Sequence, residues 1–193
     1  DRVLAAREAG CDFTLLCNNR RGVIQALDRM TIRNYQISPE KWHALCGQFN
    51  QQISSTAIGI NSGVYTQGAW ATAVGSLAGQ IEQGSEAVAV GDQAGQRNQG
   101  YAAVAVGYNA GQTYQGAYST AVGLESGQFL QGQFAVAVGA GSGKFTQSYG
   151  CVAVGYNAGN QFQGTGSVAI GFSAAQLNQA TGCISIRTSL LRQ

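Results

Sequence analysis

The feature that most constrains the fold is a sixteen-residue repeat that occurs eight times between Ser55 and Gly182, without insertion or deletion. Its clearest copies contain Ala-Val-Ala-Val-Gly, followed by Ala-Gly-Gln and Gln-Gly. One glycine closes each Ala-Val block, at Gly59, Gly75, Gly91, Gly107, Gly123, Gly139, Gly155 and Gly171. One glutamine follows eight residues later, at Gln67, Gln83, Gln99, Gln115, Gln131, Gln147, Gln163 and Gln179. A short fixed period is typical of proteins whose units stack on one another.

Each repeat predicts one coil of a parallel β-solenoid. We number the repeat positions 1 to 16 from Ser55, Ala71, Ala87, Ala103, Ser119, Ala135, Cys151 and Ser167. Positions 1 to 4 alternate small and mostly β-branched residues, a pattern with the period of two that strands show. Glycines at positions 5, 9 and 14 predict turns, since glycine tolerates positive φ. Positions 10 to 13 predict a second, more polar strand that ends at the glutamine.

Both faces of the first strand are apolar, and this predicts an interface between copies of the chain. A thin coil holds one layer of side chains, so one apolar face must remain outside, and such faces usually mark interfaces. We expect the alanine face to lie outside, near the axis of a three-fold assembly. The expected interface residues are Ala73, Ala89, Ala105, Ala121, Ala137, Ala153 and Ala169. Inward-pointing glutamines would bond to one another, because a side-chain amide both donates and accepts.

The repeats resemble a known family of surface proteins. Gly166-Ser-Val-Ala-Ile-Gly171 and Ser119-Thr-Ala-Val-Gly123 are similar to the Ser-Val-Ala-Ile-Gly repeats in the heads of trimeric autotransporter adhesins, and to repeats in fibre-like proteins of phages and large viruses. The resemblance implies a left-handed β-roll, a homotrimer, surface attachment, and a location at the cell surface, outside the cell or on a virion. The sixteen-residue period is longer than is usual there, and no heptad stalk follows the repeats.

Residues 1–53 differ in composition from the repeat domain, 54–193, and hold twelve of the twenty charged side chains. Ser38-Pro39 precedes a helical pattern with Trp42 and Phe49 on one face, so we expect a small mixed α/β cap. Residues 9–30 resemble the last strand and helix of the barrel in bacterial β-N-acetylglucosaminidases, which are glycoside hydrolases. The catalytic Lys-His and glycine-rich segment of that family has no counterpart here, so the resemblance implies no activity.

The sequence offers little chemistry for catalysis. His43 is the single histidine, and Gly139–Lys144 lacks the spacing of a phosphate-binding loop, with Phe145 where a serine or threonine is required. We therefore expect no catalytic residue, no cofactor and no metal site, and a protein that is not an enzyme. A net charge of +2 with 10% charged residues argues against nucleic acid as a partner. No apolar run reaches the length of a membrane span, and the five cysteines favour free thiols.

The remaining candidates are aromatic side chains outside the Ala-Val strand. The expected ligand contacts are Tyr101, Tyr114, Tyr118, Phe134 and Tyr149. Such rings could stack on sugars, or could instead pack between coils or between subunits. The sequence thus favours a non-enzymatic structural or adhesive fibre-head module that binds itself and a surface receptor or glycan. The alternatives are an ice-binding solenoid, although threonine fills position 2 only at Thr56, Thr72 and Thr120, and an inactive relic of a glycoside hydrolase.

Overall fold

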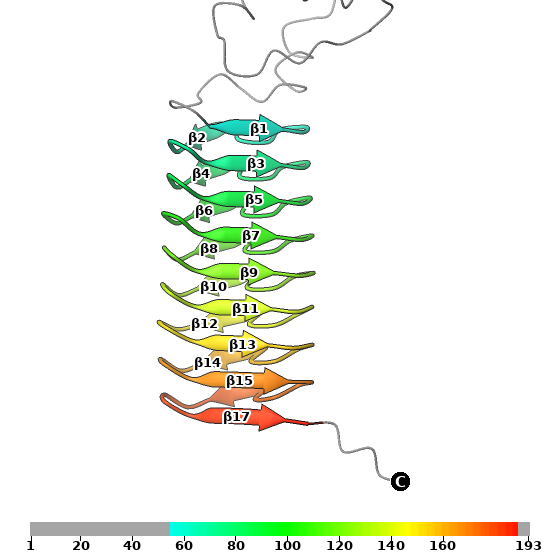
Figure 1. Ribbon diagram of the computed structural model, residues 1–193, viewed down its shortest axis with the longest axis vertical. Coiled ribbons are helices and arrows are strands. Elements are labelled where there is room, and N and C mark those ends of the chain that lie inside the picture. Colours follow the sequence, from blue (N-terminus) through cyan, green and yellow to red (C-terminus); the bar gives the residue numbers. More distant parts are fainter. Residues whose placement is uncertain (1–54, 189–193) are drawn as a thin grey trace, which may run out of the picture. The chain divides into compact units, whose positions relative to one another are not determined.

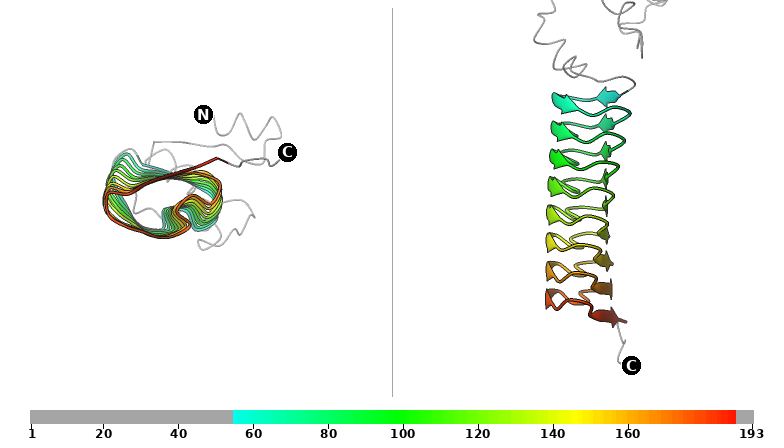
Figure 2. Two further views of the ribbon diagram at one scale, coloured as in Figure 1. Left: turned by 90° about the horizontal axis from the view of Figure 1, so that it is seen from below. Right: turned by 90° about the vertical axis from the view of Figure 1, so that its left-hand side faces the viewer.

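A computed structural model describes residues 55–188, and in this region the chain is a parallel β-solenoid (Figure 1). Each sixteen-residue repeat forms one coil with two strands, and a seventeenth strand follows the eighth coil. Viewed along the axis, successive coils superimpose (Figure 2). At about 4.8 Å per coil, the stack is about 38 Å long. The predicted fold of the repeats is confirmed. The predicted α/β cap, the boundary after residue 53 and His43 lie outside the described residues.

The first strand of every coil belongs to one nine-stranded sheet, in which each strand pairs with the equivalent strands of the coils above and below. Its strands, in order, are β1 (Thr56–Ile58), β3 (Thr72–Val74), β5 (Val88–Val90), β7 (Val104–Val106), β9 (Thr120–Val122), β11 (Val136–Val138), β13 (Val152–Val154), β15 (Val168–Gly171) and β17 (Ile184–Arg187). The register is the repeat period, so Ala73 lies opposite Ala89 and Val74 opposite Val90.

The second strand of every coil belongs to an eight-stranded sheet on the other side of the solenoid. Its strands are β2 (Tyr65–Gln67), β4 (Ile81–Gln83), β6 (Arg97–Gln99), β8 (Thr113–Gln115), β10 (Phe129–Gln131), β12 (Phe145–Gln147), β14 (Gln161–Gln163) and β16 (Leu177–Gln179). All pairings are parallel, and each glutamine at position 13 lies opposite the next one, as Gln131 does with Gln147. Identical residues therefore stack in columns in both sheets.

Turns between the strands depend on backbone at positive φ. In the third coil, φ is 130° at Gly91, 56° at Gln93, 51° at Gly95 and 50° at Ala102, and the middle residue of β6, Asn98, also has a positive φ of 54°. Position 5 is the most demanding, because φ near 130° is reached easily only by glycine. Position 5 of the last strand is Arg187, which lies opposite Gly171. The last described strand is thus the one whose repeat lacks this glycine.

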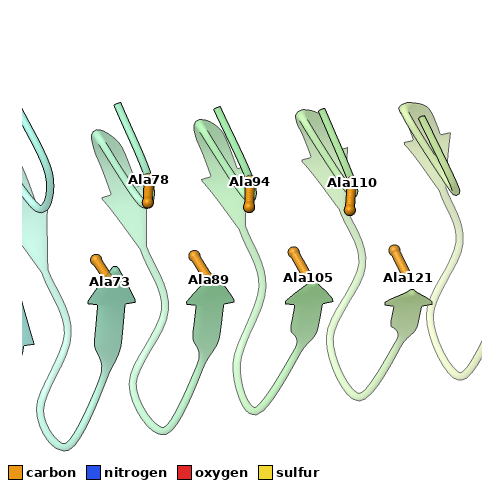
Figure 3. Close-up of a cluster of buried hydrophobic side chains, with 7 residues drawn as sticks. All are labelled: Ala73, Ala78, Ala89, Ala94, Ala105, Ala110 and Ala121. Atoms are coloured by element: carbon orange, nitrogen blue, oxygen red, sulfur yellow. The ribbon is translucent and has the colours of Figure 1, made fainter. Parts of the chain in front are cut away.

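The interior is narrow and is filled by alanine. Ala73, Ala89, Ala105 and Ala121 point from the nine-stranded sheet toward Ala78, Ala94 and Ala110, which come from the turn before the second strand (Figure 3). The seven alanines expected at an oligomer interface are all 0% exposed within the single chain. That expectation was wrong. The interior accepts only small side chains at positions 1, 3 and 8, and the larger valines must point outward.

The glutamines at position 13 cross this interior and join the two sheets. Gln99 Nε2 donates to the Val88 carbonyl at 2.8 Å and to the Ala103 carbonyl of the next coil at 3.2 Å. Bonds between glutamines form lower in the stack, where Gln147 donates to Gln163 at 2.8 Å and Gln163 to Gln179 at 3.0 Å. These side chains are buried. They fix the distance between the sheets as well as the register of the coils.

Candidate binding surfaces of the solenoid

The outer side of the nine-stranded sheet is a flat apolar surface, which we call the valine face. Its two columns are Thr56, Thr72, Val88, Val104, Thr120, Val136, Val152, Val168 and Ile184 at position 2, and Ile58, Val74, Val90, Val106, Val122, Val138, Val154, Ile170 and Ile186 at position 4. All are half-buried or exposed. None is charged, and threonine supplies the only polar groups. No other described element covers this face.

Size explains why these residues, and not the alanines, lie outside. Alanines at position 3 pack against alanines or serines at position 8 across the interior, so a valine in either column would overpack it. The same signal is visible in the sequence, because position 8 alternates only between serine and alanine over eight repeats. Sequence reasoning counted the small residues at positions 1 and 3 as one face of a strand and missed their partners at position 8.

A second surface is a row of aromatic side chains at the turn between positions 14 and 1. Four of the five predicted contact residues form it: Tyr101, Tyr118, Phe134 and Tyr149, which we call the aromatic row. The ring centroids of neighbours lie 5.3, 5.2 and 5.5 Å apart. The four side chains are 41% to 56% exposed. Packing between coils therefore orders the rings and still leaves them accessible.

The rings of the aromatic row have two orientations. Tyr118 and Phe134 are stacked with an interplanar angle of 2°. Tyr101 and Tyr149 are inclined by 75° and 73° to their neighbours. Because successive coils are displaced along the solenoid axis, the faces of the stacked pair point toward adjacent coils. The two terminal rings are therefore turned out of the plane that the stacked pair shares.

Glu86 extends the row at the Tyr101 end, and sequence reasoning did not include it. The Tyr101 hydroxyl donates a hydrogen bond to Glu86 Oε1 at 2.6 Å. That bond, with smaller contributions from burial and from the negative charge of Glu86, raises the pKa of Tyr101 above its ordinary value of 10.0. The phenol stays protonated, and the carboxylate keeps a second oxygen for other partners.

Tyr114, the fifth predicted contact residue, lies apart from the row at position 12 of the repeat and is exposed. Two further ring pairs stack on other columns: Phe129 with Phe145, at 5.6 Å, and Tyr156 with Phe172, at 5.2 Å. Aromatic stacking between coils is thus common on this surface. Only the row from Tyr101 to Tyr149 joins four rings in the described part of the chain.

A shallow groove of about 330 Å³ lies over coils six to eight. Its lining includes Thr146, Ser148, Phe162, Asn178 and Thr181. Ser148 stands at position 14, which is glycine in the first five coils, and it directly precedes Tyr149. The amide of Ser148 donates to the Gln163 carbonyl at 3.0 Å, against 2.8 Å for Gly132 and Gln147 in the coil above. The groove therefore includes a point where the repeat departs from its pattern, and it is joined to the aromatic row through Ser148, the residue before Tyr149.

The described residues offer no site for metal chemistry: no three of their histidine, cysteine, aspartate or glutamate side chains come together. Lys144 forms an ion pair with Glu125 at 2.7 Å. Cys151 is buried and Cys183 is exposed, and both are free thiols. Residues 55–188 contain no helix of the length and apolarity that crossing a membrane requires.

Comparison with known proteins gives one partial likeness. A stretch of 56 residues is 39% identical to a β-hexosaminidase of Photobacterium profundum. The stretch covers 29% of this chain and 17% of that enzyme. The likeness agrees with the resemblance of residues 9–30 to a glycoside hydrolase. No family model matches the sequence, and no solved structure matches it.

The fold and its columns define the class: the described part of the chain is a tandem-repeat β-solenoid. The resemblance to adhesin heads, with its left-handed coil and homotrimer, stays a prediction.

Proposed function

We propose that the chain is a non-enzymatic structural and adhesive module that assembles with copies of itself through the valine face. The observation that carries the proposal is this uncharged, flat face of nine strands, which no other described element covers. Exposed apolar surfaces of this extent mark interfaces in soluble proteins. The module would serve on a cell surface, outside the cell or on a virion, as a rigid fibre head that holds a receptor-binding surface.

The area of the strands alone is too small for a stable assembly, so the residues that flank them must also take part. Nine strands at about 4.8 Å spacing and about 10 Å of strand width give roughly 400 Å². A stable interface buries about 800 Å² on each partner. A pair that used the strands alone would fall short of this area. The proposed trimer therefore requires that exposed side chains beside the strands, such as Leu124 and Tyr156, also join the contact.

The mass of the assembly in solution tests this proposal. We expect the purified chain to have the mass of a trimer by light scattering at micromolar concentration. Val104→Asp places a charge near the middle of the valine face and should give monomers, because a buried unpaired carboxylate opposes association. Val104→Thr is the matched control, since threonine occupies the same repeat position in three other coils, and its mass should not change.

A stable monomer of the unaltered chain would contradict the proposal and leave the valine face free. The regular spacing of that face then favours the second candidate, ice binding. Thermal hysteresis that disappears in Val104→Asp would support this candidate. A trimer without thermal hysteresis would dismiss it.

A further inference from the structure

We infer that the aromatic row and the adjoining groove form one extended binding site for a neutral, linear glycan. The inference deepens the adhesive part of the proposed function and rests on it, because it names the class of ligand. Two observations support a ligand here: four neighbouring rings that stay exposed although they pack on one another, and a groove lined by Ser148, where the repeat loses a glycine directly before Tyr149.

The ring geometry suits a chain of sugars. A pyranose presents an apolar face of C–H bonds, which packs on an aromatic ring, and a rim of hydroxyls, which seek hydrogen bonds. Tyr101 and Tyr149 are inclined to the rings beside them and lie three coils apart, about 14 Å along the axis. Tyr118 and Phe134 lie between them and stack on each other. A linear oligosaccharide laid along the solenoid meets an aromatic surface at both ends of this span.

Polar groups accompany the rings at both ends of the path. At one end, Glu86 accepts the Tyr101 hydroxyl and retains a free carboxylate oxygen for a sugar hydroxyl. At the other end, the groove is lined by Thr146, Ser148, Thr181 and Asn178, which carry neutral polar groups, and by Phe162, whose ring is exposed. Rings interspersed with neutral donors and acceptors match the alternating apolar and polar character of a glycan.

Charge distinguishes among glycans. Neither the aromatic row nor the groove lining contains lysine or arginine, and Glu86 adds a negative charge. An acidic glycan would bring carboxylates or sulfates to a site without a cation to pair them, which is unfavourable. The site therefore fits neutral chains, and flat β-1,4-linked ones fit the straight row best.

The departure of Ser148 from the repeat points to selection for something other than the coil. Glycine at position 14 lets coils approach closely, since a Cβ at Gly132 would lie 2.5 Å from the carbonyl carbon of Ser148. With serine at this position, the hydrogen bond from its amide to Gln163 in coil seven is 3.0 Å long, against 2.8 Å from Gly132 to Gln147, and Ser148 lines the groove. Local departures from an otherwise consistent pattern are typical of functional sites.

Calorimetric titration of the purified, assembled chain with cellohexaose and with N-acetylchitohexaose tests the inference. We expect at least one of these neutral hexasaccharides to bind. Tyr149→Ala should weaken binding by about tenfold or more, as truncation of a central aromatic contact does. Ser148→Gly restores the repeat and should weaken binding several-fold without lowering the melting temperature. Tyr156→Ala removes an equally exposed tyrosine from another column and should leave affinity unchanged.

Several results would overturn the inference. These are absence of binding to both hexasaccharides, an affinity of Tyr149→Ala equal to that of the unaltered chain, and tighter binding of an acidic hyaluronan hexasaccharide. A fall in assembly mass in Tyr149→Ala would show that the row is a contact between subunits, and would also contradict a glycan site. Light scattering on the same samples separates this failure from that of the proposed function. An intact trimer that binds no glycan would refute the glycan site and would leave the proposed assembly through the valine face unaffected.

Discussion

At the scale of single residues, the glycine at position 5 sets how closely neighbouring coils approach. Gly107 has φ of 130°, and a Cβ built on it would lie 2.6 Å from the carbonyl oxygen of Gly123 in the next coil. Both the backbone conformation and the contact therefore exclude a side chain. Among the strands of the nine-stranded sheet, β17 alone has another residue at this position, Arg187, which lies opposite Gly171.

Gly107→Ala should lower the free energy of unfolding by at least about 3 kcal/mol, because backbone strain and a backbone overlap add up. Gly150→Ala is the control, since its Cβ would meet nothing within 4 Å and its φ of 65° is close to the 50° that Ala102 adopts at the same repeat position. We expect it to cost about 1 kcal/mol. Denaturant unfolding measures both values, and equal losses would show that glycine is needed only for conformation.

Tyr101 gives a prediction about pH. Its raised pKa comes first from the hydrogen bond that its hydroxyl donates to Glu86. The folded chain thus holds the phenolic proton more tightly than the unfolded chain does. The resulting contribution to stability is complete below the ordinary pKa of 10.0 and is lost as the pH rises through the raised value. Because the hydroxyl lies at the solvent-exposed surface, the effect on stability is small, and titration is the better measurement.

An ultraviolet difference titration of the unaltered chain against Tyr101→Phe should isolate one phenol that ionises above the ordinary range. Glu86→Ala should bring that phenol back toward its usual pKa, with little effect on the backbone, because alanine occupies the same repeat position at Ala102. If the pKa of Tyr101 is the same in Glu86→Ala as in the unaltered chain, the hydrogen bond with Glu86 does not form in solution.

At the scale of elements, the sequence was enough to predict both strands of every coil, because the period of two at positions 1 to 4 and the glycine turns are local signals. It was not enough to predict which face of the first strand lies inside. That choice depends on the distance between the sheets, which the glutamines at position 13 set by reaching the opposite strand, as Gln99 reaches the Val88 carbonyl. The distance between the two sheets depends on the complete coil, so it cannot be predicted from the sequence of one strand.

The same reason explains what was missed in the candidate site. The exposed aromatic residues could be selected from the sequence, because they depart from the small and polar residues around them. The sequence did not show that Tyr114 lies apart from the other four, because it does not reveal which side of the coil each repeat position occupies. Ser148 was also visible in the sequence, as a glycine lost from position 14. The importance of this substitution became clear only from the groove that Ser148 lines, because residues of three adjacent coils form that groove.

At the scale of the whole solenoid, each coil contacts only its neighbours, so stability should be a sum over coils and their interfaces. The pairing confirms this pattern, since β3 pairs only with β1 and β5 in its sheet. The number of coils should therefore be adjustable, whereas the length of one coil should not. A chain that loses one complete period keeps every column of glycine, alanine and glutamine in register.

Deletion of residues 71–86 removes the second coil and no member of the aromatic row. We expect the shortened chain to keep the strand spectrum in circular dichroism and to unfold cooperatively, at a lower temperature because one coil interface is lost. Deletion of residues 71–78 alone shifts the columns by half a period and brings the alanines of one strand opposite turn residues. This variant should lose the cooperative transition. A similar loss in both variants would mean that the stack depends on its total length more than on the phase of the repeat.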